Sequence, residues 1–397
     1  MRTPFSALPA FPAELGARLR EWRHHLHQHP ELAFQERETA AYLTEVLKAV
    51  GVEDVVTGVG GTGIVATLSR GTGGKAIGLR ADMDCLPLQE AGSHGYRSRH
   101  DGTMHACGHD GHMTMVLGAA ALLAEQGGFD GTVRFLFQPA EEPGRGAQAM
   151  MDDGLFERFP IDAIFGLHNI PGLAAGEFGT RTGPFLASED NFEIRVVGRG
   201  GHAASPHLVV DPIVIGAEVV LALQTIVART LDPSRSAVVS CTQFVTDGAR
   251  NAIPNEVVIR GDTRSFTDEV REVLERRIRE LAHGICAGHG ATCQVTYTHE
   301  FDPTVNDAAC VEAAVRAARD LLGEEHVDAR CPVNLSSEDF GVFARHVPGC
   351  FAFIGNGTAP GEGGAPLHST DYDFNDDILE LGVRYYATLV RSLLTED

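Results

Sequence analysis

Nine residues near position 108 combine one thiol, three imidazoles and one carboxylate. The run from Met104 to His112 reads Met-His-Ala-Cys-Gly-His-Asp-Gly-His and leads into an apolar stretch with helical spacing. A buried core gains nothing from so many hydrogen-bonding groups, whereas a transition-metal site needs thiolate and imidazole donors that converge on one point. The sequence therefore indicates metal chemistry.

Cys107 and His109 are the first candidate ligands in this run. They stand two residues apart at the predicted start of a helix, where a lowered thiol pKa and exposed backbone donors would favour a thiolate. The structural alternative is a buried cysteine beside a helix-capping Asp110. The surrounding histidines favour the metal interpretation.

Glu141 and Glu142 are adjacent carboxylates, and they point different ways if the backbone stays extended. One of them can then bind a metal while the other faces a water molecule and acts as a general base. Such a pair in isolation is more typical of a solvated surface. This pair follows the apolar, β-rich run 132–137, so we expect it to belong to a site.

Four further polar residues follow apolar runs. Asp82 and Asp84 end one such run, His168 ends another, and His368 comes directly after Pro-Leu. Either histidine alone could be a satisfied core histidine, and one aspartate could orient a ligating imidazole. Because parallel strands bring their carboxyl ends to one edge of a sheet, we expect these side chains to gather there.

The elements that would position these residues alternate between strand and helix. We expect strands at the short apolar runs 64–68, 76–79, 132–137 and 163–167, and a helix over 112–125. This order predicts an α/β fold with a mostly parallel sheet and helices on both of its faces. A chain of 397 residues has room for about two or three domains, or for one large domain with an insertion.

From about residue 188 the pattern changes to βαββαβ, which predicts a ferredoxin-like insertion. We place this inserted domain at 187–299, and we place one discontinuous domain at 1–186 and 300–397. The second of these would carry the metal site.

Three polar residues of the insertion are candidates for substrate contacts. His202 follows Gly-Gly, Asn251 precedes Ala-Ile-Pro, and Arg264 lies in Gly-Asp-Thr-Arg-Ser. Their donors are those that an oxyanion and a substrate carboxylate require. A simple turn is the alternative interpretation of the glycine-flanked histidine.

Composition argues against several classes of partner. With 54 acidic and 32 basic residues the net charge is −22, which disfavours nucleic acid as a ligand. The chain shows neither a signal segment nor an apolar run of about 18 residues, so we expect no membrane contact and a cytoplasmic location.

The eight cysteines show no paired spacing, which suits reduced thiols rather than disulfides. The glycine-rich run 58–63 leads into a strand rather than a helix, which disfavours a nicotinamide oxidoreductase.

Taken together, the motifs resemble the dinuclear metal amidohydrolases that include aminoacylase, carboxypeptidase G, hippurate hydrolase and the plant hydrolases of auxin (IAA) conjugates with amino acids. The resemblance runs almost end to end and is carried, in the family's order, by His-Gln-His-Pro-Glu-Leu, Leu-Arg-Ala-Asp-Met-Asp-Cys-Leu-Pro, Met-His-Ala-Cys-Gly-His-Asp-Gly-His, Phe-Gln-Pro-Ala-Glu-Glu, Gly-Gly-His-Ala-Ala, Asn-Ala-Ile-Pro and Leu-His-Ser-Thr-Asp-Tyr-Asp-Phe-Asn-Asp. It implies two divalent metal ions per subunit, zinc or manganese first and cobalt or nickel as alternatives. The ligands that it implies are Cys107, which would bridge both ions, His109, Glu142, His168 and His368.

The same resemblance implies roles for the other candidates. Glu141 would be the general base and acid, and Asp84 the helper aspartate. Asp82 stands where many members have a ligating histidine, which places the chain in the hippurate and auxin-conjugate branch. The insertion would be a dimerisation lid, from which His202 reaches the partner subunit's site to polarise the scissile carbonyl. Arg264 and Asn251 would hold the substrate near its carboxylate and carbonyl. A homodimer or a higher homo-oligomer through the inserted domain is therefore expected.

These roles predict an amidohydrolase that cleaves N-acyl amino acids, hippurate-like or N-acetyl, into a carboxylate and a free amino acid. A dipeptidase and a deacylase of a biosynthetic N-acyl intermediate are alternatives within this class. A non-catalytic metal-binding or sensor protein is the alternative from another class. Glu141 argues against it, because a proton-transfer group has little role in simple binding.

Overall fold

The structure, a computed structural model, describes residues 11–395. The chain divides into two units: Met1–Phe185, Val305–Pro332 and Asp339–Asp397 form the first, and Leu186–Thr304 and Val333–Glu338 form the second. Residues 1–10 and 396–397, which we assigned to the discontinuous domain, lie outside the described part of the chain.

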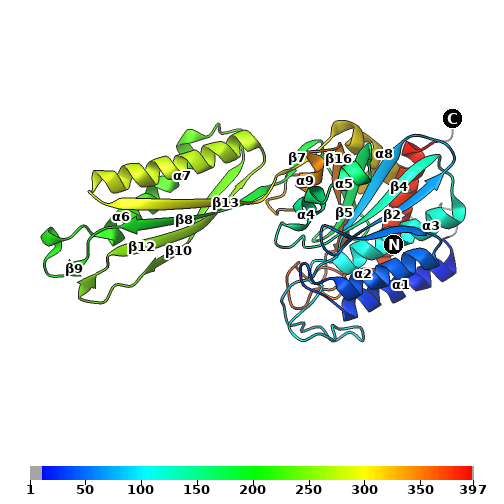
Figure 1. Cartoon of the computed structure of the whole chain (residues 1–397), viewed down its shortest axis with the longest axis horizontal. Coiled ribbons are helices and arrows are strands. Elements are labelled where there is room, and N and C mark those ends of the chain that lie inside the picture. Colours follow the sequence, from blue (N-terminus) through cyan, green and yellow to red (C-terminus); the bar gives the residue numbers. More distant parts are fainter. Residues whose placement is uncertain (1–10, 396–397) are drawn as a thin grey trace. The chain divides into compact units, whose positions relative to one another are not determined.

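An eight-stranded sheet forms the centre of the first unit (Figure 1). Its strands, in their order across the sheet, are β1 (Asp54–Val59), β2 (Gly63–Arg70), β4 (Gly131–Gln138), β3 (Ala76–Asp82), β5 (Ala163–Pro171), β16 (Gly349–Gly357), β6 (Phe178–Gly179) and β15 (Val327–Asp328). The central strands β4, β3, β5 and β16 run parallel, whereas β1 and β2 form an antiparallel hairpin at one edge. The predicted α/β fold with a mainly parallel sheet is confirmed.

Helices pack on both faces of this sheet, which is why its central strands are mostly buried. Phe135 and Phe165 belong to the core that α3 and α10 share, whereas Phe351 of β16 packs against Phe340 of α9 with the rings 5.1 Å apart. The helices of this unit are α1 (Ala13–Gln28), α2 (Arg37–Ala49), α3 (His109–Gln126), α4 (Gly146–Asp152), α5 (Leu155–Arg158), α8 (Ala308–Leu322), α9 (Phe340–Ala344) and α10 (Leu379–Leu393).

The helix α3 is the most deeply buried one. Every residue from His109 to Leu123 is buried, so the helix shows no polar face. It begins three residues before the predicted start because the backbone N–H of His112 already donates to the carbonyl of Gly108 at 3.0 Å. Among the described helices, α3 included, none is long and apolar enough to cross a membrane.

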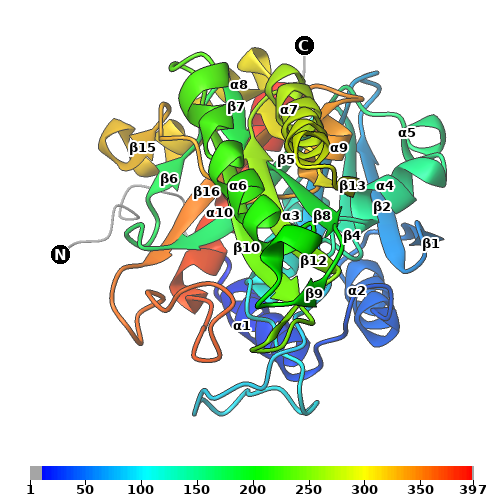
Figure 2. The same ribbon diagram turned by 90° about the vertical axis from the view of Figure 1, so that its left-hand side faces the viewer.

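The second unit is a four-stranded antiparallel sheet with the strand order β10-β12-β8-β13. Its helices α6 and α7 run side by side over the sheet and enclose an apolar core (Figure 2). This βαββαβ arrangement is the predicted ferredoxin-like fold. The elements of this unit, with a small β9–β11 pair, are β8 (Ser188–Val197), β9 (Gly201–His202), α6 (Pro212–Leu223), β10 (Ala237–Thr246), β11 (Ala252–Ile253), β12 (Glu256–Ser265), α7 (Asp268–Gly288) and β13 (Thr292–Phe301). The separate pair of β7 (Gly183–Leu186) and β14 (Thr304–Asn306) has most of its residues in the first unit.

Candidate metal centre

The structure brings the five predicted ligands together where the parallel strands of the first unit end. His168 lies near the end of β5, and Glu142 follows β4 after a short turn. Cys107 and His109 flank the first turn of α3, and His368 comes from the loop before α10. We call Cys107, His109, Glu142, His168 and His368 the thiol cluster.

Distances within the thiol cluster match those between ligands of a common ion. Cys107 Sγ lies 3.5 Å from His168 Nε2 and 3.4 Å from His368 Nε2, and His368 Nε2 lies 3.5 Å from Glu142 Oε2. Two ligands on a tetrahedral zinc, with bonds of about 2.0–2.3 Å, stand roughly 3.3–3.6 Å apart. The donor atoms therefore fit a transition-metal ion.

Cys107 belongs to two ligand groups at once. One group joins it to His109 and His168, the other to Glu142 and His368, and within each group the donor atoms lie within 4.8 Å of one another. A thiolate has lone pairs for two cations. Cys107 is thus placed where a ligand that bridges two ions would stand.

Hydrogen bonds orient two of the imidazoles. His168 Nδ1 donates to the carbonyl of Asn169 at 2.6 Å, and His109 Nδ1 donates to the carbonyl of Asp84 at 2.9 Å. Each ring therefore turns Nε2 toward the cluster, as metal-binding histidines do. Burial and the neighbouring His112 lower the pKa of His168, which keeps its imidazole neutral and its lone pair free.

The expected low pKa of the thiol is wrong for the metal-free chain. Burial and the carboxylate of Glu142 raise the pKa of Cys107 well above its ordinary value, and they outweigh the opposing effect of His109. Burial alone would lower the pKa of His109, but Asp82 and hydrogen bonds to Asp84 and Cys107 raise it. A divalent cation reverses this balance, since a coordinated thiol loses its proton.

Asp84 fixes the turn that carries the two glutamates. Its Oδ1 accepts from the backbone N–H of Glu141 and its Oδ2 from that of Glu142, both at 3.0 Å. The preceding Ala140 has a φ of 49°, which is unfavourable for a residue other than glycine, and its N–H donates to Glu36 Oε1 at 2.9 Å. The sequence gives no signal for Glu36, which lies more than a hundred residues upstream.

Glu141 itself is buried at the rim of the cluster. Its side chain is 8% exposed, and Oε2 lies 3.9 Å from His109 Nε2. Its donor atom lies within 4.8 Å of those of His109 and Glu142, so the carboxylate stands beside the ligands, where a proton-transfer group is needed.

Asp82 orients other residues. It accepts from Arg80 Nη1 at 2.8 Å and pairs with His112 Nδ1 at 2.7 Å, while His112 Nε2 lies 2.8 Å from Asn169 Oδ1. Asn169 Nδ2 donates to the hydroxyl of Tyr372 at 2.6 Å. His112 ends the motif 104–112 and Asn169 directly follows His168, yet the roles of both residues were not predicted.

Gly108 brings the backbone before α3 close to this chain of side chains. Its φ is 91°, and a Cβ atom on it would collide with Asn169 Oδ1 and the hydroxyl of Tyr372. A glycine is therefore required between the two ligands Cys107 and His109.

The alternative interpretation of Asp110 as a helix cap does not hold, because the N-cap of α3 is Gly108. The buried carboxylate of Asp110 instead pairs with His27 Nδ1 at 2.8 Å and with Arg23 at 3.4 Å. Among the histidines of α1, His27 is fully buried, and His24 and His25 are half-buried.

The candidate substrate residues lie in the second unit. His202 and Asn251 are exposed neighbours on the β9–β11 pair, where the N–H of Ala203 donates to the carbonyl of Asn251 at 3.0 Å. Arg264 lies near the far end of β12 and pairs with Glu189 at 2.8 Å and Asp262 at 3.0 Å. The structure thus keeps His202 with Asn251 but separates both from Arg264 along the strand.

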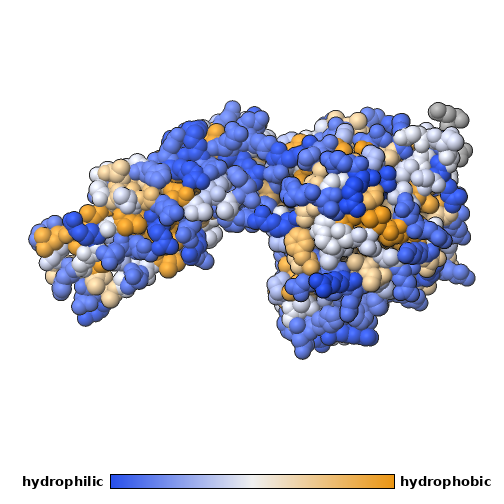
Figure 3. Space-filling model, viewed as in Figure 1, coloured by the Kyte–Doolittle hydropathy of each residue, from blue (hydrophilic) through white to orange (hydrophobic). Residues whose placement is uncertain are grey.

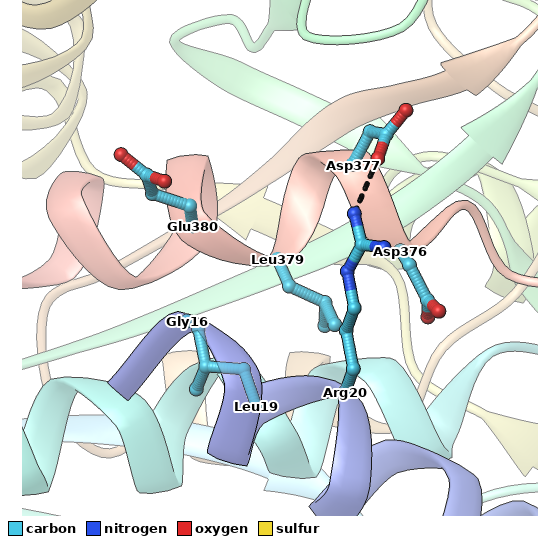
Figure 4. Close-up of a pocket in the computed structure, with 7 residues that line it drawn as sticks. All are labelled: Gly16, Leu19, Arg20, Asp376, Asp377, Leu379 and Glu380. Atoms are coloured by element: carbon cyan, nitrogen blue, oxygen red, sulfur yellow. Dashed lines mark hydrogen bonds and ion pairs between the residues drawn. The ribbon is translucent and has the colours of Figure 1, made fainter. Parts of the chain in front are cut away.

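A pocket of about 440 Å³ between α1 and the start of α10 contains none of these residues (Figure 4). Arg20 points across it and donates to Asp377 Oδ1 at 2.8 Å, with Glu380 beside them. One cation among several acidic residues gives no set of catalytic groups. The thiol cluster is the better candidate site.

Comparison with known proteins gives consistent results. The model of peptidase family M20/M25/M40 matches residues 78–392. The chain is 39% identical over 381 residues to a hippurate hydrolase of Campylobacter jejuni, covering 96% of this chain and 98% of the relative. It is 37% identical to IAA-amino acid hydrolase ILR1-like 2 of Arabidopsis thaliana, covering 94% and 84%. A crystal structure of the Bacillus subtilis YXEP protein, described as a dinuclear metal binding peptidase from the M20 family, superposes with a TM-score of 0.84 at 32% identity, covering 96% and 99%.

Proposed function

The chain belongs to peptidase family M20/M25/M40, as the resemblance predicted, and from this premise we propose that it hydrolyses the amide bond of N-acyl amino acids. The products would be a carboxylate and a free amino acid. The names of the two relatives support this substrate class, since hippurate and IAA-amino acid conjugates are both N-acyl amino acids.

The observation that carries the proposal is the pairing of Glu141 with a full ligand set. Its carboxylate Oε2 stands 3.9 Å from His109 Nε2, and the backbone N–H groups of Glu141 and Glu142 are both held by Asp84. A site that only binds metal needs the ligands, but it does not need a second carboxylate beside them. The sensor interpretation is therefore less favoured.

We propose that the thiol cluster holds two divalent ions, with zinc or manganese first and cobalt or nickel as alternatives. The dinuclear description of the related Bacillus subtilis protein and the shared position of Cys107 support the number of ions. When bound, such ions act as Lewis acids on a carbonyl and lower the pKa of water.

The residues of this chain then transfer protons, position the glutamates and bind the substrate. Glu141 takes a proton from the attacking water and returns it to the departing amine nitrogen, which completes hydrolysis. Asp84 positions Glu141 and Glu142. His202 and Asn251 donate hydrogen bonds to the oxyanion and carbonyl, and Arg264 binds the carboxylate of the substrate.

We propose that His202 serves the site of a partner subunit. His202 and Asn251 lie at one end of β12 and Arg264 near the other, about 26 Å apart for eight residues of extended strand. An N-acyl amino acid is shorter than this separation. One substrate therefore contacts Arg264 and His202 together only if they come from different chains.

An apolar surface on the second unit supports this dimer (Figure 3). Leu221 and Val214 of α6 are 72% and 60% exposed, and Val245 and Phe244 lie exposed on the edge strand β10. Such a surface is typical of a contact between proteins. We expect Leu221→Asp to convert a dimer into a monomer in sedimentation experiments, whereas Leu335→Asp, at an exposed apolar residue outside α6 and β10, leaves the mass unchanged.

A panel of N-acetyl, N-benzoyl and indole-acetyl amino acids tests the activity, with release of the amino acid detected by ninhydrin. We expect release that chelators abolish, that added zinc or manganese restores, and that Glu141→Gln lacks. Release from dipeptides alone would favour the dipeptidase alternative. Metal binding without any hydrolysis would favour the sensor alternative.

We also propose a cytoplasmic location. All eight cysteines lie within residues 11–395 and are free, which suits a reducing compartment.

A further inference from the structure

A second group of metal-binding side chains lies in the first unit, outside the thiol cluster. We propose that His27, Glu90 and His94, which we call the imidazole cluster, form an additional mononuclear site for a divalent transition metal. Glu90 Oε1 lies 2.7 Å from His94 Nε2 and 3.4 Å from His27 Nε2. The three donor atoms all lie within 4.8 Å of one another.

Two of the three donors, those of His27 and Glu90, are turned toward the cluster by a hydrogen bond on their far side, and His94 has a carboxylate near its far nitrogen. His27 Nδ1 donates to Asp110 at 2.8 Å, which leaves Nε2 facing Glu90. His94 Nδ1 lies 3.9 Å from a carboxylate oxygen of Asp373. Glu90 Oε2 accepts from the backbone N–H of Ser98 at 2.6 Å, which leaves Oε1 for the cluster. Carboxylates behind imidazoles are the usual outer contacts of metal-binding histidines.

The surroundings favour a cation and give it access. Glu90 and Asp110 are both buried, and the one arginine in contact with Asp110, Arg23, is shared with two further aspartates. His27 lies between the carboxylates of Glu90 and Asp110, 3.4 Å from the first and 2.8 Å from the second, so the cluster attracts positive charge. A metal ion supplies this charge by displacing the proton from Nε2. The side chain of His94 is 18% exposed and provides a path to solvent.

His105 is an independent indication of a ligand at this place. Its ring lies 6.4 Å from that of His27, it is 1% exposed, and neither of its ring nitrogens has a hydrogen-bond partner among the described residues. A buried imidazole without a hydrogen-bond partner is costly unless water or a ligand reaches it.

The donors define the class of ion. Two imidazole nitrogens and one carboxylate oxygen suit zinc, cobalt, nickel, iron(II) or manganese, whereas calcium and magnesium prefer oxygen ligands. With three protein ligands the coordination shell stays open for water. A structural or a reactive role is compatible with this shell.

Metal counting on the full chain tests the proposal. Metal-stripped protein is dialysed against Zn²⁺ or Co²⁺ and the bound metal is measured by mass spectrometry. We expect His94→Ala to bind one equivalent fewer than the wild type, and Glu90→Gln, which preserves the size of the side chain, to lose the same equivalent. His346→Ala, at an exposed histidine elsewhere in this unit, is the matched control and keeps the wild-type count.

A second arm separates this site from the thiol cluster. In Cys107→Ser/Glu142→Gln, the Co²⁺ absorption that remains should disappear when His94→Ala is added. Equal counts in wild type, His94→Ala and Glu90→Gln would overturn the proposal and leave a hydrogen-bonded network. Equal losses in His94→Ala and His346→Ala would also overturn it, because they indicate binding to surface histidines. These counts do not depend on amide hydrolysis, so an inactive protein with the expected counts contradicts only the proposed function.

Discussion

The thiol cluster and the imidazole cluster, both in the first unit, use similar side chains in different ways. At the thiol cluster, the carboxylates of Glu142 and of its neighbour Glu141 each stand 3.9 Å from His109 Nε2, which is longer than a hydrogen bond. In the imidazole cluster Glu90 stands 2.7 Å from His94, and Asp110 behind the cluster stands 2.8 Å from His27. Spacing in the first suits ions and a reacting molecule between the groups. Contact in the second lets a shared proton neutralise part of the charge.

The largest expected effect contrasts one glutamate from each cluster. Glu141→Gln removes the proton acceptor and should lower kcat by about 10³-fold, within the usual range for a general base. It should leave the metal content unchanged, because the amide retains the volume of the side chain. Glu90→Gln should act mainly on metal content and stability. Rates of amino-acid release and metal analysis on both variants measure the contrast.

Glu125→Gln, at an exposed residue near the end of α3, is the control for the glutamate pair. If Glu141→Gln retained near wild-type kcat, Glu141 could not be the base. If Glu141→Gln and Glu90→Gln instead lost the same amount of rate and the same amount of metal, the two clusters would not differ in function.

The second effect concerns pH and the imidazole cluster in metal-stripped protein. Asp110 and Glu90 raise the pKa of His27 from 6.5 to about 9 against the opposing effect of burial. A raised folded-state pKa stabilises the fold fully below pH 6.5, and the stabilisation is lost as pH rises through about 9. At 1.36 kcal/mol per pKa unit, His27 should account for a loss of about 3 kcal/mol in the free energy of unfolding.

Urea unfolding between pH 6 and 10 measures this loss, with the fluorescence of the single tryptophan, Trp22, as the probe on α1. His27→Gln should be less stable at pH 6 and should show a flatter pH dependence than the wild type. Bound zinc should flatten the wild-type curve too, since it replaces the proton. Parallel curves for wild type and His27→Gln would contradict the shifted pKa.

How well the sequence predicts each cluster depends on its local context. His168 and Glu142 follow apolar runs typical of strands, and Cys107 stands just before an apolar helix. The α/β fold and the gathering of these side chains at one sheet edge can therefore be predicted from the spacing of apolar residues and from the order of strands and helices along the chain. The inserted fold is likewise readable, because its βαββαβ order has strong apolar patterns.

The imidazole cluster lacks such a context. Glu90 and His94 lie in residues 83–108, a connection without helix or strand periodicity, and only the tertiary fold brings them to His27 on α1. Glu36 is even further in sequence from the turn that it holds, 104 residues before Ala140, compared with the 63 residues between His27 and Glu90. Asp110 looked like a helix cap because its buried partners, Arg23 and His27, are invisible in local sequence. Contacts between polar residues that are far apart in the sequence cannot be predicted from the spacing of apolar residues or from composition.

A third, smaller effect separates positioning from proton transfer in the thiol cluster. Asp84→Asn keeps one carbonyl oxygen but replaces the other acceptor with an amide donor, so the N–H of Glu141 or that of Glu142 loses its partner. We expect a 10- to 100-fold loss in metal affinity or activity, as is usual for outer contacts of a metal site.

Excess metal should partly restore the activity of Asp84→Asn but not that of Glu141→Gln. Asp162→Asn is the control, because Asp162 accepts from the backbone N–H of Ala76 at the other end of β3. Failure of metal to restore any activity would indicate that Asp84 takes part in the chemistry directly.

The smallest effect tests the chain of hydrogen bonds behind the thiol cluster. Tyr372→Phe removes the hydroxyl that accepts from Asn169 Nδ2 at 2.6 Å, and both side chains are fully buried. We expect a loss of about 1 kcal/mol in the free energy of unfolding, because an amide donor is left unpaired. The rate should change little, since His168 keeps its own bond to the carbonyl of Asn169. Tyr385→Phe, at a buried tyrosine that packs on Phe178, is the matched control. A large loss of rate in Tyr372→Phe with little loss of stability would mean that the hydrogen bonds behind the ligands set the geometry of the ligands. The thiol cluster would then depend on hydrogen bonds between side chains as much as the imidazole cluster does.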